Sequence, residues 1–276
     1  MINQRFFGHP ESPLFGVYHQ PRGNNSKTAT RAAVICPPVG QEYNRTHWTL
    51  RLLANQVARK GVHVLRFDYQ GIGDSAQNVE QIKDLETWEN NIEQAIAHVK
   101  KESGAETVML VGQRMGGALA ANVAQKRPDV NGVVFWETIL SGKEYLDSLR
   151  SMHAKMLDLW VCRMKTPNDS EHEEVLGSLM SRSLVNDIES LAIDLSKVVQ
   201  PQLIVDCSNR TKLYSHPEPS TQFIIEDPRS NSWNELSELE LAWLRPDMLR
   251  KLVQKIVDMF DRLERFNALA NVETVQ

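Results

Sequence analysis

Hydrophobic positions along the chain form two alternating kinds of segment. The first kind is a short apolar run rich in β-branched residues, and such runs cover 32–38, 62–68, 107–112, 132–137, 201–207 and 220–227. The second kind has apolar residues at helical spacing and lies between most of these runs. This alternation is typical of a mostly parallel sheet with crossover helices. The sequence therefore predicts an α/β fold.

The helical segments show one apolar stripe each. In 85–101 the stripe is long, and its members are Leu85, Trp88, Ile92, Ala95, Ile96 and Val99. In 48–60 it consists of Trp48, Leu52, Leu53 and Val57. After Pro246 the stripe consists of Leu249, Leu252, Ile256, Phe260 and Leu263. Each stripe is expected to pack on the sheet, with proline at the first position of the last helix.

Two regions depart from this alternation. The segments QRFFGH and LFGVYHQP near the start alternate apolar and polar residues, as an antiparallel edge ribbon does. Residues 141–197 show helical spacing and no strand pattern, which predicts a helical cap insertion. The expected domains are thus a core of 1–140 and 198–268, a cap of 141–197, and a flexible tail of 269–276.

The pentapeptide Gly112-Gln113-Arg114-Met115-Gly116 lies between a buried strand and a helix of small residues. This is the context of the G-x-S-x-G nucleophile elbow of α/β hydrolases, in which a serine projects above the sheet from a strained turn. Both glycines are present and the serine is replaced by Arg114. A guanidinium stays protonated at ordinary pH and has no lone pair for attack on a carbonyl. Serine-esterase chemistry is therefore not expected.

The other members of a catalytic triad are also missing from their usual places. The histidine normally follows the last strand, but the segment after FIIED reads PRSNSWNEL. His216 precedes that strand, which makes it a poor candidate. Asp206 ends its strand near the acid position, although a structural role for a strand-end carboxylate is the simpler interpretation.

Four segments together resemble one family of α/β hydrolases. They are CPPVGQEYNRTH, VLRFDYQGIGDS, LVGQRMGGALAA and WETILSGKEYL, and they lie within residues 30–150. The chain is similar here to the type 2 hydrolases associated with the exosortase A system of Gram-negative bacteria. The resemblance implies an α/β-hydrolase fold, an arginine as the usual elbow residue, and a cytoplasmic bacterial protein encoded beside exopolysaccharide or surface-sorting machinery. It supplies no substrate.

Arg114 has two alternative roles. A helix N-terminus favours negative charge, so Arg114 could bind an anionic ligand there, helped by the backbone of Met115. The resemblance would add the loop around Val39 and Gly40. His47 is expected in the same loop and could contact the ligand, although a histidine in a surface loop usually has no chemical role. Alternatively, Glu137 or Glu42 neutralises Arg114. Internal pairing is the favoured alternative, because a buried unpaired charge is costly.

Composition narrows the range of partners. The formal net charge is −4, which argues against a general nucleic-acid binder. Cys36, Cys162 and Cys207 have neither zinc-site nor disulfide-framework spacing, which favours a reducing cytoplasm. No segment has the roughly 20 apolar residues of a membrane span, nor the pattern of a signal peptide. No cofactor or metal is predicted.

Two functions follow from these residues. The first is a pseudo-hydrolase, a binding or accessory protein for an acyl, glycosyl or anionic ligand, small or carrier-bound. The second is an enzyme in which Arg114 acts as an electrostatic clamp and Glu42, Glu137 or Asp206 moves a proton. A homo-oligomer that uses the insertion as its interface is compatible with either.

Overall fold

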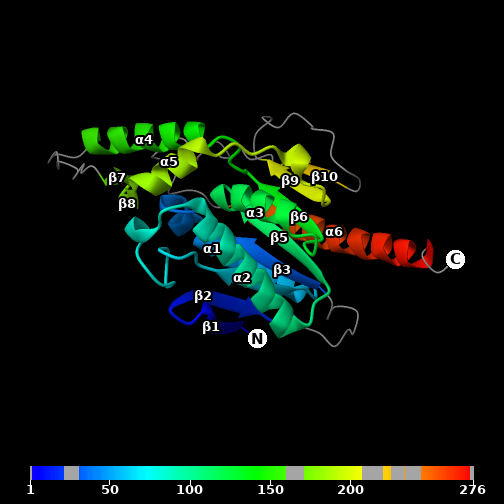
Figure 1. The fold of residues 1–276 in the computed structure, drawn as a ribbon. Coiled ribbons are helices and arrows are strands. Elements are labelled where there is room, and N and C mark those ends of the chain that lie inside the picture. The colour runs from blue at the N-terminus through cyan, green and yellow to red at the C-terminus, as the bar shows by residue number, and fades with distance from the viewer. Residues whose placement is uncertain are drawn as a thin grey trace.

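An eight-stranded, mostly parallel sheet forms the centre of the molecule (Figure 1). The computed structural model describes residues 2–21, 31–159, 171–206, 220–224, 233 and 244–273. The strands of the sheet are β1 (Ile2–His9), β2 (Ser12–His19), β3 (Arg31–Cys36), β4 (His63–Phe67), β5 (Thr107–Gln113), β6 (Gly132–Trp136), β9 (Gln202–Asp206) and β10 (Thr221–Ile224). Their spatial order is β1-β2-β4-β3-β5-β6-β9-β10. Only the pairs β1–β2 and β2–β4 are antiparallel, which confirms both the predicted α/β fold and the edge ribbon.

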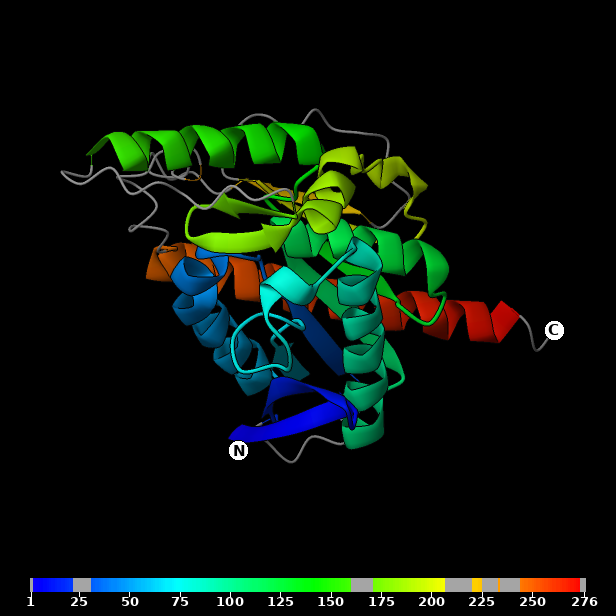
Figure 2. The same ribbon diagram turned by 60° about the vertical axis from the view of Figure 1, so that its left-hand side comes forward.

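Helices cover both faces of this sheet (Figure 2). On one face, α2 (Leu85–Ser103) and α3 (Met115–Lys126) belong to the larger hydrophobic cluster of the core. On the other, α1 (Gln41–Arg59) and α6 (Pro246–Glu273) bury a second cluster. Strands buried on both faces explain the continuous apolar runs seen in the sequence.

The predicted stripes of α2 and α6 are confirmed. Every member of both stripes is buried, and α6 begins at Pro246. In α2, Asp84 accepts a hydrogen bond from the Thr87 N–H, and Gly104 ends the helix in the left-handed conformation. The last helix continues to Glu273, so residues 269–273 of the predicted tail are helical.

The prediction for α1 is wrong at its start. This helix begins at Gln41, seven residues before the expected position, and Trp48 is 46% exposed instead of facing the core. The buried positions of its first half are polar, namely Glu42, Thr46 and Thr49. A buried face made of polar residues produces no hydrophobic periodicity, which explains the error.

The segment between β6 and β9 forms a cap that is not purely helical. It contains α4 (Gly142–Leu159), the hairpin β7 (His172–Val175) with β8 (Ser178–Ser181), and α5 (Arg182–Ser190). The prediction that no strand occurs here is therefore wrong. The hairpin turn, Leu176-Gly177, has positive φ at both positions, as a type I′ turn requires. Figure 1 shows the cap above the central sheet, with α4 outermost.

Candidate functional site

Arg114 occupies the strained turn predicted from the sequence. It links β5 to α3 with φ 55° and ψ −121°, a conformation that side-chain-bearing residues rarely adopt. Its two flanking glycines are required by close packing. A Cβ on Gly112 would lie 2.5 Å from the Gly117 Cα, and one on Gly116 would lie 2.2 Å from the Cys36 carbonyl oxygen. The geometry of a nucleophile elbow is present without its nucleophile.

Backbone hydrogen bonds anchor this turn to the segment after β6. The Arg114 N–H donates to the Trp136 carbonyl at 3.0 Å, and the Arg114 carbonyl accepts from the Ile139 N–H at 3.3 Å. The same carbonyl accepts from the Gly117 N–H at 3.0 Å, which begins α3. The position of the Arg114 side chain is therefore determined by the sheet.

The Arg114 side chain forms a buried ion pair with Glu42. Its Nε and Nη2 donate to Glu42 Oε1 at 3.0 and 2.8 Å. The two side chains are only 12% and 2% exposed. Glu42 lies in the first turn of α1, where a carboxylate is favoured by the helix dipole, whereas a cation at the start of α3 is disfavoured. The Glu42 carboxylate therefore stabilises the Arg114 guanidinium, which the dipole of α3 destabilises.

Two aromatic rings complete the surroundings of the guanidinium. The Arg114 Cζ lies 4.7 Å from the centroid of the Trp233 ring and 5.9 Å from that of Tyr145, both within cation–π range. The Tyr145 hydroxyl also donates to Glu42 Oε2 at 3.5 Å. Tyr145 belongs to α4, so the cap contacts both members of the ion pair.

The electrostatics of the pair favour the charged arginine. Burial alone would lower the pKa of Arg114, but the attraction and hydrogen bonds of the Glu42 carboxylate outweigh it, so the pKa is raised. Arg114 is thus a permanent cation, and it cannot serve as a proton donor or acceptor.

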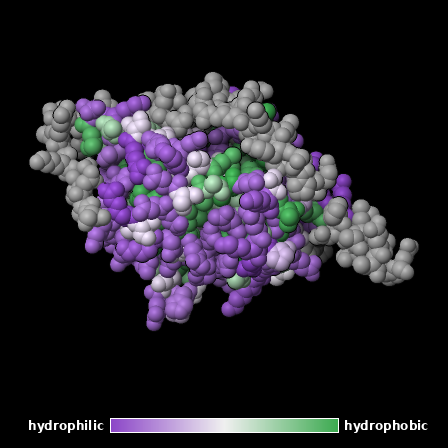
Figure 3. All heavy atoms as spheres, turned by 45° about the horizontal axis from the view of Figure 1, so that its top comes forward, coloured by the Kyte–Doolittle hydropathy of each residue, from purple (hydrophilic) through white to green (hydrophobic). Residues whose placement is uncertain are grey.

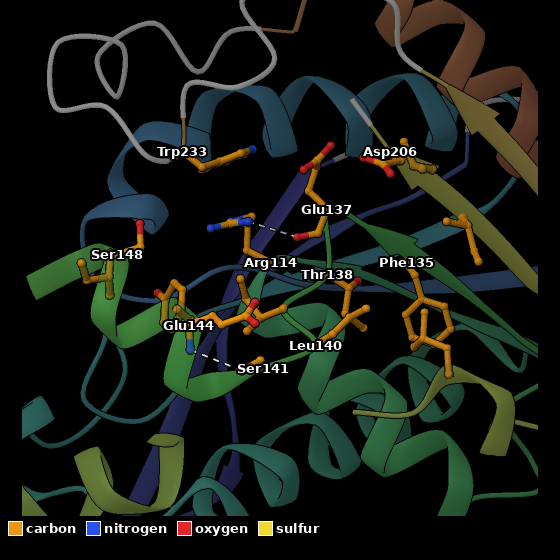
Figure 4. A pocket seen from close by; sticks show the side chains of 16 residues that line it. Arg114, Phe135, Glu137, Thr138, Leu140, Ser141, Glu144, Ser148, Asp206 and Trp233 are labelled. Atoms are coloured by element: carbon orange, nitrogen blue, oxygen red, sulfur yellow. Dashed lines mark hydrogen bonds between the residues drawn. The ribbon is translucent and has the colours of Figure 1, made fainter. Parts of the chain in front are cut away.

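A cavity of about 400 Å³ opens beside this pair (Figure 4). It lies between the carboxyl ends of β6 and β9 and the start of α4, and its polar walls come from Arg114, Glu137, Thr138, Ser141, Glu144, Tyr145, Ser148, Asp206 and Trp233. The remaining lining residues are apolar, namely Phe135, Ile139, Leu140, Leu149, Leu195, Ile204 and Val205. Its volume is in the range of small-molecule sites. Hydrophobic residues also reach the surface on this capped side of the molecule (Figure 3).

Two N–H groups of the Arg114 guanidinium remain for a ligand in this cavity. Of its five N–H groups, those on Nε and one on Nη2 bind Glu42, and one on Nη1 reaches the Glu137 carbonyl at 3.4 Å. The other two, one on each terminal nitrogen, have no acceptor among the described residues. Arg114 lines the cavity, so these two donors belong to its polar wall.

The structure brings three of the predicted site residues together in the cavity wall. Arg114, Glu137 and Asp206 all line it, and the predicted pairing of Arg114 with an internal carboxylate is formed by Glu42. Glu137 contributes its carbonyl group to Arg114 from a residue with φ 48°. The ion-pair partner of Arg114 is Glu42, while Glu137 is one of the residues that line the cavity.

The remaining predicted contacts lie elsewhere. Met115 and Val39 have buried side chains in the hydrophobic core, and Gly40 caps α1 with φ 60°. His47 was expected in a loop, but it lies within α1, exposed, with its ring 5.8 Å from that of Tyr43. None of these four is among the described residues that line the cavity.

Sequence reasoning missed several residues of the site. Tyr145 and Trp233 contact Arg114 directly, while Glu144, Ser141 and Ser148 add polar groups to the wall. Trp233 had no recognisable signal, since it comes from a segment without periodicity. No histidine is among the described lining residues, although His216 lies outside the part of the chain that the structure describes.

Other kinds of site are not indicated in the same ranges. The described residues contain no group of three histidine, cysteine or acidic side chains placed to bind a metal. No helix within them combines the length and hydrophobicity that crossing a bilayer requires. Cys36 is a free thiol in β3, and burial raises its pKa, so it is not a reactive nucleophile.

Solved structures similar to this one are α/β hydrolases. A putative hydrolase from Agrobacterium vitis superposes with a TM-score of 0.57 at 16% identity, covering 94% of this chain and 98% of that one. Est1E from Butyrivibrio proteoclasticus gives 0.56 at 14% identity over 95% and 99%. Est1E with bound ferulic acid gives 0.55 at 18% identity over 73% and 77%. At these identities the likeness concerns the fold.

Sequence comparison gives the family. No curated protein sequence matches the chain. The model of the family described as serine aminopeptidase, S33, matches residues 31–233, well over half of the chain. This confirms the α/β-hydrolase part of the resemblance, while the narrower resemblance to exosortase-associated proteins stays a prediction. The chain belongs to the serine aminopeptidase S33 family of α/β hydrolases.

Proposed function

We propose that this protein binds a small ligand, or the small end of a carrier-bound one, in the cavity beside Arg114, without serine-triad catalysis. The observation that carries the proposal is the ion pair of Arg114 with Glu42 at the position of the nucleophile. A guanidinium bonded to a carboxylate can orient a ligand but cannot form an acyl-enzyme. The protein is then a hydrolase-fold binding or accessory component.

The shape and lining of the cavity support binding. Apolar side chains from β6, β9 and the cap form one part of its wall, and hydroxyl, carboxylate and guanidinium groups form the rest. Such a mixture suits a ligand with a carbon skeleton and a few polar groups, such as an acyl or glycosyl compound. The two free donors of Arg114 would fix its orientation.

The setting of this binding function is the second part of the proposal. The resemblance to exosortase-associated proteins supports a role in a bacterial biosynthetic or surface-polysaccharide pathway. The buried, free thiol of Cys36 is compatible with a cytoplasmic location. The ligand would then be an intermediate or a carrier-bound group of that pathway.

An enzymatic function is the alternative, and one observation favours it. Glu137 and Asp206 line the same cavity as Arg114, so a carboxylate that moves a proton could lie near a group held by the guanidinium. Glu42 is less suited to this role, because its carboxylate is bonded to Arg114 and Tyr145 and is only 2% exposed.

A substrate panel separates the two functions. Ester, thioester and amide substrates are incubated with the wild type, with Arg114→Ala, and with Arg245→Ala, which changes an arginine that is not among the described lining residues. We expect no turnover above the buffer rate for any of the three proteins. Turnover that is abolished by Arg114→Ala and retained by Arg245→Ala would establish the enzyme instead.

Binding is tested separately with a cavity-filling variant. Ser148→Trp places a large ring in the cavity wall, and Val199→Trp places one at a surface position that is 75% exposed. Fragments of neutral acyl and glycosyl compounds are screened by ligand-observed NMR. The proposal expects binders that Ser148→Trp loses and Val199→Trp keeps, and the absence of any such fragment would contradict it.

A further inference from the structure

The cavity contains a cation whose charge is already balanced from within the protein. Glu42 approaches Arg114 along the Nε–Nη2 edge, the edge that a bound carboxylate commonly takes. Arg114 is itself the N-cap of α3, and the carboxylate bonds to its side chain. The carboxylate-binding edge of Arg114 is therefore occupied by a side chain of the same chain.

From this occupancy we infer that Glu42 sets the charge selectivity of the cavity, which takes a ligand that is uncharged where it meets Arg114. The inference rests on the proposed binding function and names its ligand class. The ligand is a neutral carbonyl compound, an amide or an ester, whose oxygen accepts from the N–H groups that remain on Nη1 and Nη2. Carboxylates and phosphates bind more weakly.

Anion binding in the cavity is weak because an anion would lose more free energy on desolvation than it gains from Arg114. It would give up its hydration on entering the cavity and would meet a guanidinium whose charge Glu42 has cancelled. Glu144, from the same wall, would add repulsion. A neutral carbonyl group loses less hydration and can still accept one or two hydrogen bonds.

The second carboxylate oxygen of Glu42 also has a partner. This oxygen, Oε2, accepts from the Tyr145 hydroxyl at 3.5 Å, and the guanidinium lies 4.7 Å from the Trp233 ring. The Glu42 side chain is only 2% exposed, so water has little access to its carboxylate. An incoming anion therefore has no easy route to displace it.

The apolar wall sets the rest of the ligand. Phe135 and Ile204 extend from the sheet, and Leu149 and Leu195 from the cap segment. They provide a surface for an alkyl or aryl group attached to the carbonyl. Hexanamide and hexanoate form a matched pair of probes, since they share the chain and differ in charge.

The first experiment uses the wild-type protein and calorimetric titration at two pH values. At neutral pH we expect hexanamide to bind about tenfold more tightly than hexanoate. Below the pKa of the probe acid, hexanoic acid is uncharged, and the difference should vanish. Equal affinity at neutral pH would overturn the inference, as would binding of neither probe.

The second experiment reverses the selectivity. Glu42→Gln keeps the shape of the side chain and removes its charge, so Arg114 becomes an unbalanced cation. Hexanoate affinity should rise about tenfold, while hexanamide affinity changes less than about threefold. Glu144→Gln removes a carboxylate of the same wall that is not part of the ion pair, and should raise hexanoate affinity by clearly less than Glu42→Gln does.

The outcomes remain distinguishable from failure of the proposed function. One outcome refutes the charge selectivity alone. In it, Glu42→Gln leaves hexanoate affinity unchanged, while Ser148→Trp still abolishes the binding of fragments. Ester turnover dependent on Arg114 would refute the binding function. If Glu42→Gln does not fold, the wild-type comparison at two pH values still decides.

Discussion

Two partly buried arginines of this protein differ in the partner that each has, and their pKa values shift in opposite directions. Arg114 is bonded to the Glu42 carboxylate, and its pKa is raised. Arg66 in β4 donates through Nε to His19 Nε2 at 3.2 Å, and its pKa is lowered, first by burial. No carboxylate in the described part of the chain lies within ion-pair distance of Arg66.

The difference shows how one residue type supports two roles. At His19, burial and then the Arg66 cation favour the unprotonated imidazole. Next to a carboxylate, an arginine forms a neutral unit that can line a cavity without attracting anions. The contact of Arg66 with His19 makes the stability of the fold depend on pH. The pair of Arg114 with Glu42 makes ligand binding depend on the charge of residue 42. Three changes sharpen this contrast.

The largest effect is expected from Glu42→Ala. It leaves the Arg114 guanidinium buried and unpaired, which should lower the free energy of unfolding by about 3–5 kcal/mol. Urea unfolding followed by circular dichroism measures the change. A loss below about 1 kcal/mol would mean that the guanidinium reaches water, and that the ion pair contributes little.

A smaller effect is expected from acid. Burial, and then Arg66, lower the pKa of His19 from 6.5 to about 4. As the pH falls, His19 therefore binds a proton near pH 6.5 in the unfolded chain but only near pH 4 in the folded protein. Stability from this source is complete above pH 6.5 and falls as the pH decreases toward 4.

The acid effect is measured as the urea midpoint across that pH range. In His19→Gln the fall between pH 6.5 and 4 should be reduced, because the titrating group is absent. An unchanged slope in the variant would show that other groups cause the pH dependence.

The smallest effect is expected from an ion pair of the cap. Glu173 accepts from Arg150 Nε and Nη2 at 2.6 and 3.0 Å and from Arg182 Nη1 at 3.1 Å. The two arginines are 34% and 43% exposed, so both keep access to water. Glu173→Ala should cost about 0.2–1 kcal/mol, against several for Glu42→Ala. Equal costs in the same urea assay would contradict the role assigned to burial.

The fold was largely predictable because its core strands are buried on both faces. Such strands give continuous apolar runs, and α2 and α6 have one apolar stripe each. The start of α1 was missed because its buried face is polar. The hairpin β7–β8 was missed because its four-residue strands are joined by Leu176-Gly177, whereas asparagine or aspartate usually precedes glycine in such turns.

The site was predictable only where backbone geometry required particular residues. Gly112 and Gly116 are needed for close packing at the elbow, which located Arg114. The choice between Glu42 and Glu137 as its partner depended on the start of α1, which the sequence pattern did not give. Tyr145 and Trp233 come from segments far apart in the sequence, and only the folded chain brings them to the guanidinium.

Labelling with a fluorophosphonate probe tests most directly the claim that no activated serine exists in the cavity. Ser141 and Ser148 line it, so an activated hydroxyl there would react covalently. We predict that the native protein remains unlabelled in intact-mass measurements under conditions that fully label an active serine esterase. Stoichiometric labelling of any serine, lost on denaturation, would contradict this account.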